Sequence, residues 1–274
     1  MEPSNRQRWK RRLGPLYGLA VALQFMTRLP VPSDLDPDTE DLADSAVWFP
    51  MVGAIVGGVL WLVVLSLRAS PLVPSVTAAG VIVTAVLLTG AFHEDALGDT
   101  ADGLGGGWTR TQMLEIMRDS RVGTYATVAI AALLGIRFVL LLGMRPTVWG
   151  PALLTAHVAG RASSLGMLAT MTYARRDDED PGFGKSFVDA QTTPRLLTGA
   201  ATAAGLCGLA AGWIGVAGLA LAAPVCAATA LYYRDQIDGM TGDCLGATNV
   251  LTEVSVLLLF ASLAPAQTSP WIAT

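Results

Sequence analysis

Three aspartates between residues 93 and 103 stand at the spacing of one helix face. Asp95, Asp99 and Asp102 lie at i, i+4 and i+7, so on a helix their carboxylates line up beside His93 and Glu94. The stretch contains no Lys or Arg to relieve their repulsion, so we expect a bound cation. Mg²⁺ suits such a site, with Mn²⁺ as the alternative, because both combine carboxylates with water and phosphate oxygens. The predicted ligands are Glu94, Asp95, Asp99 and Asp102; an acidic helix end facing water is the other interpretation.

A second cluster, Arg118, Asp119, Ser120 and Arg121, precedes a later apolar stretch. Guanidinium groups and the N–H groups of a helix start both bind phosphate oxygens. Alone the motif is weak, because basic residues are common near membrane surfaces. Beside a metal site it gains weight, since a metal ion and arginines together stabilise a phosphoryl group in transfer. We expect Arg118, Ser120 and Arg121 to bind phosphate, and Arg121 also to take part in catalysis.

A third group of candidates lies in or next to apolar stretches. Asp243 follows a glycine-rich stretch and precedes an apolar helix, where it is either a catalytic carboxylate or the cap of that helix. Glu253 and Arg161 lie inside apolar stretches, where ionisable side chains are costly and are functional candidates by default. Arg161 and His93 are predicted to contact substrate. Arg161 and Arg137 can instead pair with Glu253 or extend to a membrane interface.

The elements that position these side chains must be membrane helices. Of the 274 residues, 52% are hydrophobic and 15% charged, against about 25% charged in an ordinary soluble domain. Residues 69–92 and 196–233 contain no charged side chain, and a span needs about 20 apolar residues. This composition excludes a soluble enzyme, a disulfide scaffold and a disordered chain. A net charge of −4 offers no basic surface to nucleic acid.

We therefore expect an all-α, polytopic helical bundle of about seven spans. An N-terminal helix over 13–29, too short to cross and stopped by Pro30, should lie at the interface or re-enter the membrane. The long run 196–233 should divide near 212–218, because glycine weakens a helix interior. The expected spans are 51–67, 72–92, 122–144, 147–170, 196–212, 213–233 and 246–264.

Charge orients this bundle. The connections 93–121, 171–195 and 234–245 lie on one side and hold eight Lys and Arg residues, against Arg68 and Arg145 in the opposite turns. The positive-inside rule places the eight in the cytoplasm.

The expected organisation is a basic cytoplasmic N-terminus (1–12), one membrane-embedded catalytic domain (13–264) and a short non-cytoplasmic tail (265–274). Residues 34–44 hold six acids and no base. This pattern is typical of a solvated acidic loop; a lid or a cation-gathering loop is the alternative.

Five motifs together resemble the cobalamin synthase family, also called adenosylcobinamide-GDP ribazoletransferase. They are 27–32, 48–53, 93–103, 117–125 and 241–247, in the order seen in that family, and the similarity covers about residues 16 to 260. The resemblance implies the last assembly step of vitamin B12 synthesis, with Mg²⁺, at the cytoplasmic face of the bacterial inner membrane. A hydroxyl of α-ribazole, or of its 5′-phosphate, would attack adenosylcobinamide-GDP, giving adenosylcobalamin, or its phosphate, and GMP.

This chemistry fits the candidate residues. The acidic stretch would hold one or two Mg²⁺ ions, and the arginines of the second cluster would neutralise phosphate charge. Asp119 or Asp243 would accept the proton of the attacking hydroxyl. The implied partners are the two substrates, the lipid bilayer and other enzymes of the corrinoid pathway, and no nucleic acid.

Two other functions can use the same residues. A CDP-alcohol-type phospholipid head-group phosphotransferase also places aspartates at a membrane surface, but it leaves the non-acidic motifs unexplained. A cation-coupled transporter would bind its ion or substrate with Asp95, Glu253 and Arg161 near mid-membrane and would show inverted repeats. The sequence shows no repeat, and its acids gather at one membrane face.

Overall fold

The computed structural model describes residues 4–70, 72–175 and 183–266. Regular structure in these ranges is entirely helical, apart from isolated bridges between Met144 and Pro265 and between Tyr173 and Met240, which confirms the all-α prediction. In chain order the helices are α1 (Asn5–Leu13), α2 (Leu16–Met26), α3 (Thr39–Asp44), the 3₁₀ helix η1 (Ser45–Trp48), α4 (Phe49–Arg68), α5 (Pro74–Thr89), α6 (Phe92–Gly106), α7 (Arg110–Ile116), α8 (Thr124–Gly143), the 3₁₀ helix η2 (Pro146–Val148), α9 (Trp149–Thr170), α10 (Phe183–Asp189), α11 (Thr193–Ala220), α12 (Ala222–Ile237) and α13 (Gly242–Leu263).

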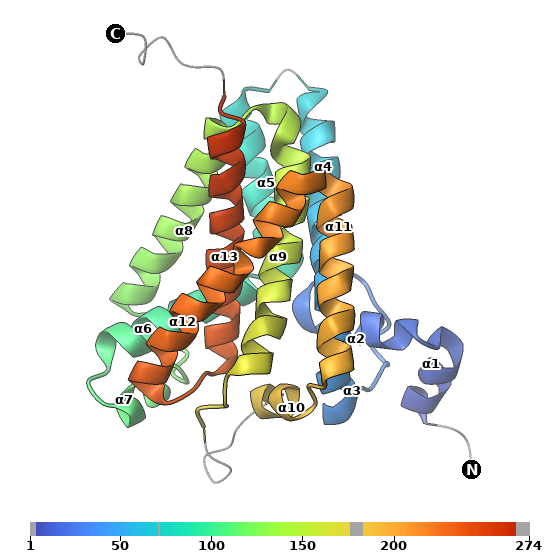
Figure 1. Ribbon diagram of the computed structural model, residues 1–274, viewed down its shortest axis with the longest axis vertical. Helices are drawn as coiled ribbons and strands as arrows, with labels where there is room; N and C mark the ends of the chain where they lie inside the picture. Colours follow the sequence, from blue (N-terminus) through green and yellow to red (C-terminus); the bar gives the residue numbers. More distant parts are fainter. Residues whose placement is uncertain (1–3, 71, 176–182, 267–274) are drawn as a thin grey trace.

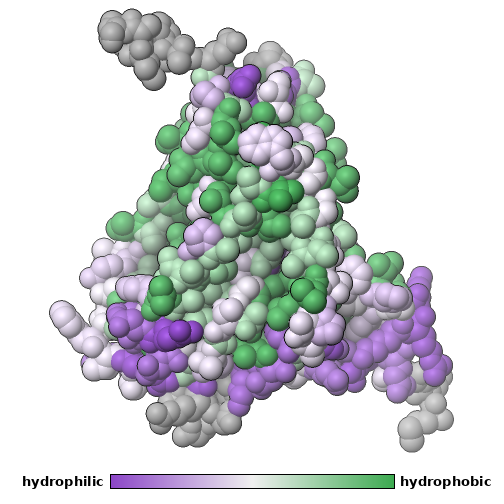
Figure 2. All heavy atoms as spheres, viewed as in Figure 1, coloured by the Kyte–Doolittle hydropathy of each residue, from purple (hydrophilic) through white to green (hydrophobic). Residues whose placement is uncertain are grey.

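The long helices form a bundle that widens toward one end, where α1, α2, α3, α7 and α10 gather (Figure 1). Figure 2 shows the same division in hydropathy, because apolar side chains cover the shaft and polar ones concentrate at the wide end. We call the wide end the polar end. Within the bundle, α9 packs against α4, α11 and α13. The core is therefore built around α9.

Four helical segments of the described residues are long and apolar enough to cross a membrane, or five if α5 and α6 form one broken span. The count of about seven spans is thus not confirmed. The span expected at 147–170 exists as the 22-residue helix α9, but polar side chains such as His157 and Arg161 are buried along it. A helix enclosed by other helices needs no apolar surface, because it does not face lipid. For this reason α9 is not among the helices apolar enough to cross a membrane, although the span was expected from the sequence.

The longest apolar run divides where its glycines predict. Helical backbone geometry is interrupted at Ala211 and Gly212, and Gly212 has a φ of +58°. Beyond this kink the chain turns back toward the polar end along α12 (Figure 1). The prediction that the run forms two helices is confirmed, although the break lies at the near edge of the expected range.

α6, which carries the acidic stretch, leaves α5 at an angle of 85°. At this bend Gly90 and Ala91 have φ values of +65° and +59°. The bend buries the first turn of α6 in the bundle and directs the remainder along the polar end, beside α7, so we treat α6 as a helix of that end (Figure 1). Gly246 of α13 lets α13 and α6 approach each other closely, because a β-carbon at residue 246 would collide with Ala96 of α6.

The N-terminal helix expected at the interface is α2, an apolar helix of 11 residues that packs on α3, η1 and α4. The acids of 34–44 hold the basic N-terminus against it: Arg6 lies 2.5 Å from Asp38 and from Asp41, and Lys10 lies 2.6 Å from Asp41. Burial alone would raise the pKa of Asp41, but the hydrogen bonds from Arg6 and Lys10 outweigh it and lower that pKa. Neither interpretation of the acidic stretch anticipated this docking.

Two predicted segments fall partly outside the described residues: 176–182 of the connection 171–195, and 267–274 of the tail 265–274. The described start of the tail is tied to α8, since the N–H of Ala266 donates to the carbonyl of Gly143 at 2.8 Å.

Candidate active site

The first turn of α6 joins an ionic network inside the bundle. Arg137 of α8 donates to Glu94 of α6 at 2.6 Å and to Glu253 of α13 at 2.5 Å. Arg161 of α9 donates to the same Glu253 carboxylate, and the Nδ1 atom of His157 lies 2.8 Å from it. These five side chains are buried. We call Glu94, Arg137, His157, Arg161 and Glu253 the ion cluster.

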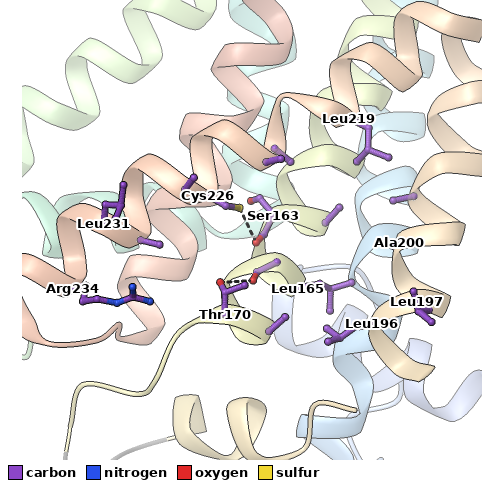
Figure 3. A pocket seen from close by; sticks show the side chains of 18 residues that line it. Ser163, Leu165, Thr170, Leu196, Leu197, Ala200, Leu219, Cys226, Leu231 and Arg234 are labelled. Atoms are coloured by element: carbon purple, nitrogen blue, oxygen red, sulfur yellow. Dashed lines mark hydrogen bonds between the residues drawn. The ribbon is translucent and has the colours of Figure 1, made fainter. Parts of the chain in front are cut away.

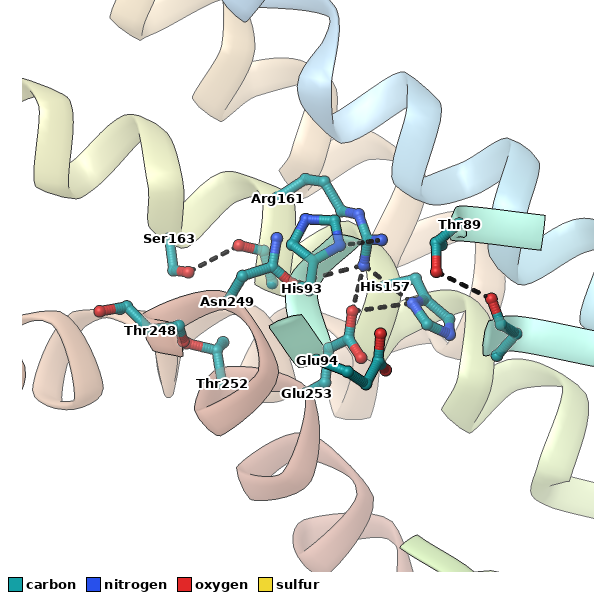
Figure 4. Close-up of polar contacts among 12 residues, drawn as sticks. Thr89, His93, Glu94, His157, Arg161, Ser163, Thr248, Asn249, Thr252 and Glu253 are labelled. Carbon is teal, nitrogen blue, oxygen red and sulfur yellow. Dashed lines mark hydrogen bonds and ion pairs between the residues drawn. The ribbon is translucent and has the colours of Figure 1, made fainter. Parts of the chain in front are cut away.

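Further polar groups close the ion cluster around Arg161. Figure 4 shows His93, His157, Asn249 and Glu253 gathered about its guanidinium group. The distances from Arg161 to Asn249 Oδ1 and to His93 Nδ1 are both 3.4 Å. The expected pairing of the intramembrane arginines with Glu253 is confirmed. Arg161, also predicted to contact substrate, lies inside this network, whereas His93 additionally lines a cavity.

Glu94 and Asp102, two of the predicted metal ligands, are engaged elsewhere. Arg137 holds Glu94, and the Asp102 carboxylate accepts N–H bonds from Gly123 at 2.6 Å and Ala126 at 2.9 Å. The first N–H groups of a helix have no partner within it, so Asp102 satisfies two of them at the start of α8. Glycine is required at 123, because a β-carbon there would overlap the carboxylate. This cap explains Gly123, the glycine of the 117–125 motif.

Asp95 and Asp243 line one cavity of about 270 Å³ at the polar end, although they come from α6 and α13. We call it the acidic cavity; its wall also contains His93, Tyr173 and Arg175 and the rings of Phe25, Phe49, Phe92 and Phe187. Asp99 lies one turn beyond Asp95. Burial, and then the charges of Asp243, Asp95 and Asp102, raise the pKa of Asp99 to about 6. The carboxylates act on one another, and a bound cation would relieve their repulsion.

The donor set suits Mg²⁺ better than an ion that needs a complete protein cage. In the described part of the chain, no three His, Cys, Asp or Glu side chains are grouped closely enough to hold a metal ion by themselves. Mg²⁺ retains several waters and binds through one or two carboxylates together with substrate phosphate. Asp95 and Asp99, one helical turn apart, offer carboxylates of this kind.

Most of the Arg118–Arg121 motif lies away from the acidic cavity. Asp119 and Arg121 form an exposed pair, in which the backbone N–H of Arg121 donates to Asp119 at 3.0 Å and its side chain donates as well. These hydrogen bonds lower the pKa of Asp119 to about 2, so in this arrangement it accepts a proton poorly. Ser120 is exposed. Asp243 is therefore the better-placed proton acceptor.

No motif or spacing singles out Arg175, yet its side chain lines the acidic cavity. The same side chain lines a smaller cavity together with Arg118, a predicted phosphate-binding residue. The one signal in the sequence is a pair of arginines, 175 and 176, in a connection between apolar runs. Such a pair is expected at any cytoplasmic membrane surface, so it carries little functional information by itself.

A cavity larger than the acidic cavity lacks the charged groups that the candidate chemistry needs. A groove of about 730 Å³ runs between α9, α11 and α12, lined mainly by small and apolar side chains such as Ala200, Leu219 and Cys226 (Figure 3). Arg234 is the charged residue of its wall. Because phosphoryl transfer depends on charged groups around the phosphorus, the acidic cavity is the candidate active site despite its smaller volume.

Comparison with known proteins finds relatives over nearly the whole chain. The model of the family described as cobalamin-5-phosphate synthase matches residues 18–261. An adenosylcobinamide-GDP ribazoletransferase of Shewanella woodyi is 36% identical over 245 residues, which are 87% of this chain and 93% of that protein. Proteins of the same name from Acetivibrio thermocellus (36% over 246 residues; 88% and 96%) and Ralstonia nicotianae (37% over 248 residues; 87% and 92%) are similarly close. No solved structure matches significantly.

Proposed function

The chain belongs to the cobalamin-5-phosphate synthase family, and from that premise we propose that its reaction takes place in the acidic cavity. The protein is a membrane enzyme, an adenosylcobinamide-GDP ribazoletransferase of cobalamin synthesis. Its substrates are adenosylcobinamide-GDP and α-ribazole, with α-ribazole 5′-phosphate as the proposed alternative acceptor. One observation carries the choice of site: Asp95 and Asp243, from two separate motifs, meet in one cavity beside Arg175.

The proposed reaction forms a bond between a ribazole hydroxyl oxygen and the phosphorus attached to cobinamide, and it breaks the bond from that phosphorus to GMP. The hydroxyl must lose its proton as it attacks. Asp243 is suited to accept it, because its carboxylate lies in the cavity wall and is oriented by a hydrogen bond of 3.3 Å from the Thr241 hydroxyl. Negative charge grows on the phosphate oxygens and the leaving group, where Arg175 can balance it.

We place Mg²⁺, with Mn²⁺ as the alternative, at Asp95 and Asp99. Bound there, the ion would neutralise and orient the phosphate oxygens of adenosylcobinamide-GDP. The raised pKa of Asp99 supports this placement, because its causes after burial are the nearby carboxylates of Asp243, Asp95 and Asp102. The ion cluster positions both sides of the site, since Glu94 precedes Asp95 on α6 and Glu253 lies on the helix of Asp243.

A purified wild-type protein supplied with both substrates and Mg²⁺ should form cobalamin and GMP. Asp243→Asn should lower turnover by about 10²- to 10⁴-fold, the usual contribution of a general base, and should keep the wild-type Tm. Asp235→Asn, which changes an exposed carboxylate at the same end, is the matched control and should keep full turnover. Full turnover in Asp243→Asn would remove this residue from the mechanism. A folded wild-type protein that makes no cobalamin but acts on a CDP-activated lipid would establish the head-group alternative.

We also propose that the polar end faces the cytoplasm of a bacterial inner membrane, which the positive-inside rule supports. Ser120→Cys should react with a membrane-impermeant thiol reagent in inside-out vesicles and not in intact cells. Thr147→Cys, exposed at the opposite end, should show the reverse pattern. Background labelling should be low, because Cys207 and Cys244 are buried and Cys226 is partly buried. Labelling of Ser120→Cys in intact cells would reverse the orientation.

A further inference from the structure

Arg175 follows a segment that is fixed to the end of α12. Immediately before it, the N–H of Ala174 donates to the carbonyl of Met240 at 2.8 Å. Arg110 of α7 donates to the carbonyl of Ala174 and, at 3.2 Å, to that of Ile237. Helix α7, the end of α12 and the connection that follows α12 therefore all contact the chain just before Arg175. These hydrogen bonds fix the position of the Arg175 backbone at the polar end.

The Arg175 side chain forms part of the wall of two cavities. One is the acidic cavity, with Asp95 and Asp243. The other, of about 140 Å³, is lined by Arg110, Thr111, Leu114, Glu115, Arg118 and Arg175. We call it the arginine cavity, because three arginines face one glutamate there. A water molecule takes about 30 Å³, so this cavity has the volume of several waters. A phosphate group can therefore fit in it.

The donors of Arg175 are not satisfied within the described part of the chain. Its Nε and one Nη nitrogen are buried and have no hydrogen-bond partner there. Buried polar groups are nearly always hydrogen-bonded, and leaving the buried donors of a charged group without hydrogen bonds costs more than leaving those of a neutral group. Nε and a terminal nitrogen form the edge of the guanidinium fork that matches two oxygens of a phosphate. Arg110, by contrast, already donates to backbone carbonyls.

We propose that Arg175 is an anion-binding residue shared by the two cavities, and that the arginine cavity binds the phosphate of a nucleoside 5′-monophosphate. A pyrophosphate needs two adjoining phosphate sites, because a single oxygen joins its two phosphorus atoms. Arg175 lies where two such sites meet. The phosphate under attack would occupy the acidic cavity, and the phosphate that leaves as GMP would occupy the arginine cavity. The identity of the nucleotide rests on the proposed function, whereas the anion site rests on Arg175 itself.

The test measures GMP binding to the purified full-length protein by calorimetry in EDTA, so that no metal contributes. Arg175→Gln should weaken GMP binding about 10- to 100-fold, the usual effect of losing hydrogen bonds to a charged group. Guanosine, which lacks the phosphate, should bind the variant and the wild type equally. Arg145→Gln, which changes an exposed arginine at the other end of the bundle, should bind GMP as the wild type does.

Arg175→Lys keeps the charge but loses the fork, so it should show an intermediate loss of GMP affinity, and it replaces Arg175→Gln if that variant does not fold. Unchanged GMP affinity in the folded variant, or no GMP binding by the wild type, would overturn the inference. The proposed function is tested separately through wild-type turnover. A protein that binds GMP through Arg175 but forms no cobalamin would refute that function and leave the anion site in place.

Discussion

The ion cluster and the acidic cavity are neighbours built on α6 and α13, yet they balance charge in opposite ways. In the ion cluster, Glu94 and Glu253 are matched by Arg137 and Arg161, so the chain neutralises itself. One residue beyond Glu94 the acidic cavity begins. One turn further along α6, burial and then the charges of Asp243, Asp95 and Asp102 raise the pKa of Asp99. Adjacent acids of one helix thus have different surroundings, because Glu94 meets Arg137 whereas Asp95 faces the acidic cavity.

The difference separates charges that hold the fold from charges that act on a ligand. A charge buried in the bundle must have its partner in the chain, because an unpaired one would cost several kcal/mol. A charge at the polar end that keeps contact with water does not need a partner within the chain and can bind an ion or ligand from solution. At the polar end, the pairs of Arg6 with Asp38 and Asp41 also balance charge within the chain, since they attach the N-terminus. Asp95 and Asp99 are of the second kind, whose partner comes from solution.

Breaking the ion cluster should have the largest effect. Arg137→Met leaves Glu94 buried without its cation, and removal of one partner from a buried pair costs about 3–5 kcal/mol. Because domains are stable by only about 5–15 kcal/mol, a loss of this size should strongly lower Tm and reduce the yield of folded protein. The yield of monodisperse protein in detergent and its Tm measure this. Combining Arg137→Met with Glu94→Gln removes one charge of each sign and should restore much of the yield. An equal loss in both variants would show that packing matters more than charge.

The adjacent residues Glu94 and Asp95 offer the sharpest contrast. Glu94→Gln should lower Tm, because it unbalances Arg137, while each folded molecule keeps most of its turnover. Asp95→Asn should keep or raise Tm, since it relieves repulsion, and should lower turnover about 100-fold or more through loss of a metal ligand. Measuring Tm and turnover on both variants tests the division of roles. The opposite pattern would place Glu94 in the reaction and Asp95 in the fold.

Metal binding should stabilise the acidic cavity and leave the ion cluster unaffected. Mg²⁺ at 100 times its Kd adds about 2.7 kcal/mol to the free energy of unfolding, so Tm should rise with Mg²⁺ and fall back with EDTA. Asp99→Asn should lose most of this rise, and the control Asp235→Asn should retain it. A full rise in both Asp95→Asn and Asp99→Asn would show that the metal binds elsewhere.

Sequence patterns predicted well what depends on local periodicity. The spacing of Asp95, Asp99 and Asp102 indicates a helix, and α6 is one. The same spacing could not show that Asp102 would cap α8 or that Glu94 would meet Arg137, because those contacts join residues that are 24 and 43 positions apart in the sequence. A helix face predicts which side chains point together, and the neighbouring helices determine what they meet.

Arg175 and α9 show two other limits. Arg175 lies in an irregular segment, where the sequence has no helical or strand periodicity from which to predict the direction of a side chain. Its position is determined by the hydrogen bond between Ala174 and Met240. Helix α9 was expected as one span among seven, but its polar residues serve the interior of the bundle, so hydropathy understates its role. In both cases the tertiary neighbours determine function, and a single sequence does not reveal them.

The smallest effect is expected at Asp119, where the contrast between the two kinds of charge is weakest. Asp119 has a partner in the chain, Arg121, but the pair is exposed, and exposed pairs open readily because water competes for both groups. Asp119→Asn should leave Tm unchanged and lower turnover less than tenfold, because the carboxylate paired with Arg121 accepts protons poorly and lies outside the acidic cavity. Measuring turnover and Tm of Asp119→Asn beside those of Asp95→Asn tests this prediction. A loss as large as that of Asp95→Asn would mean that the pair opens onto substrate during the reaction. A partner within the chain would then identify structural charges only where they are buried.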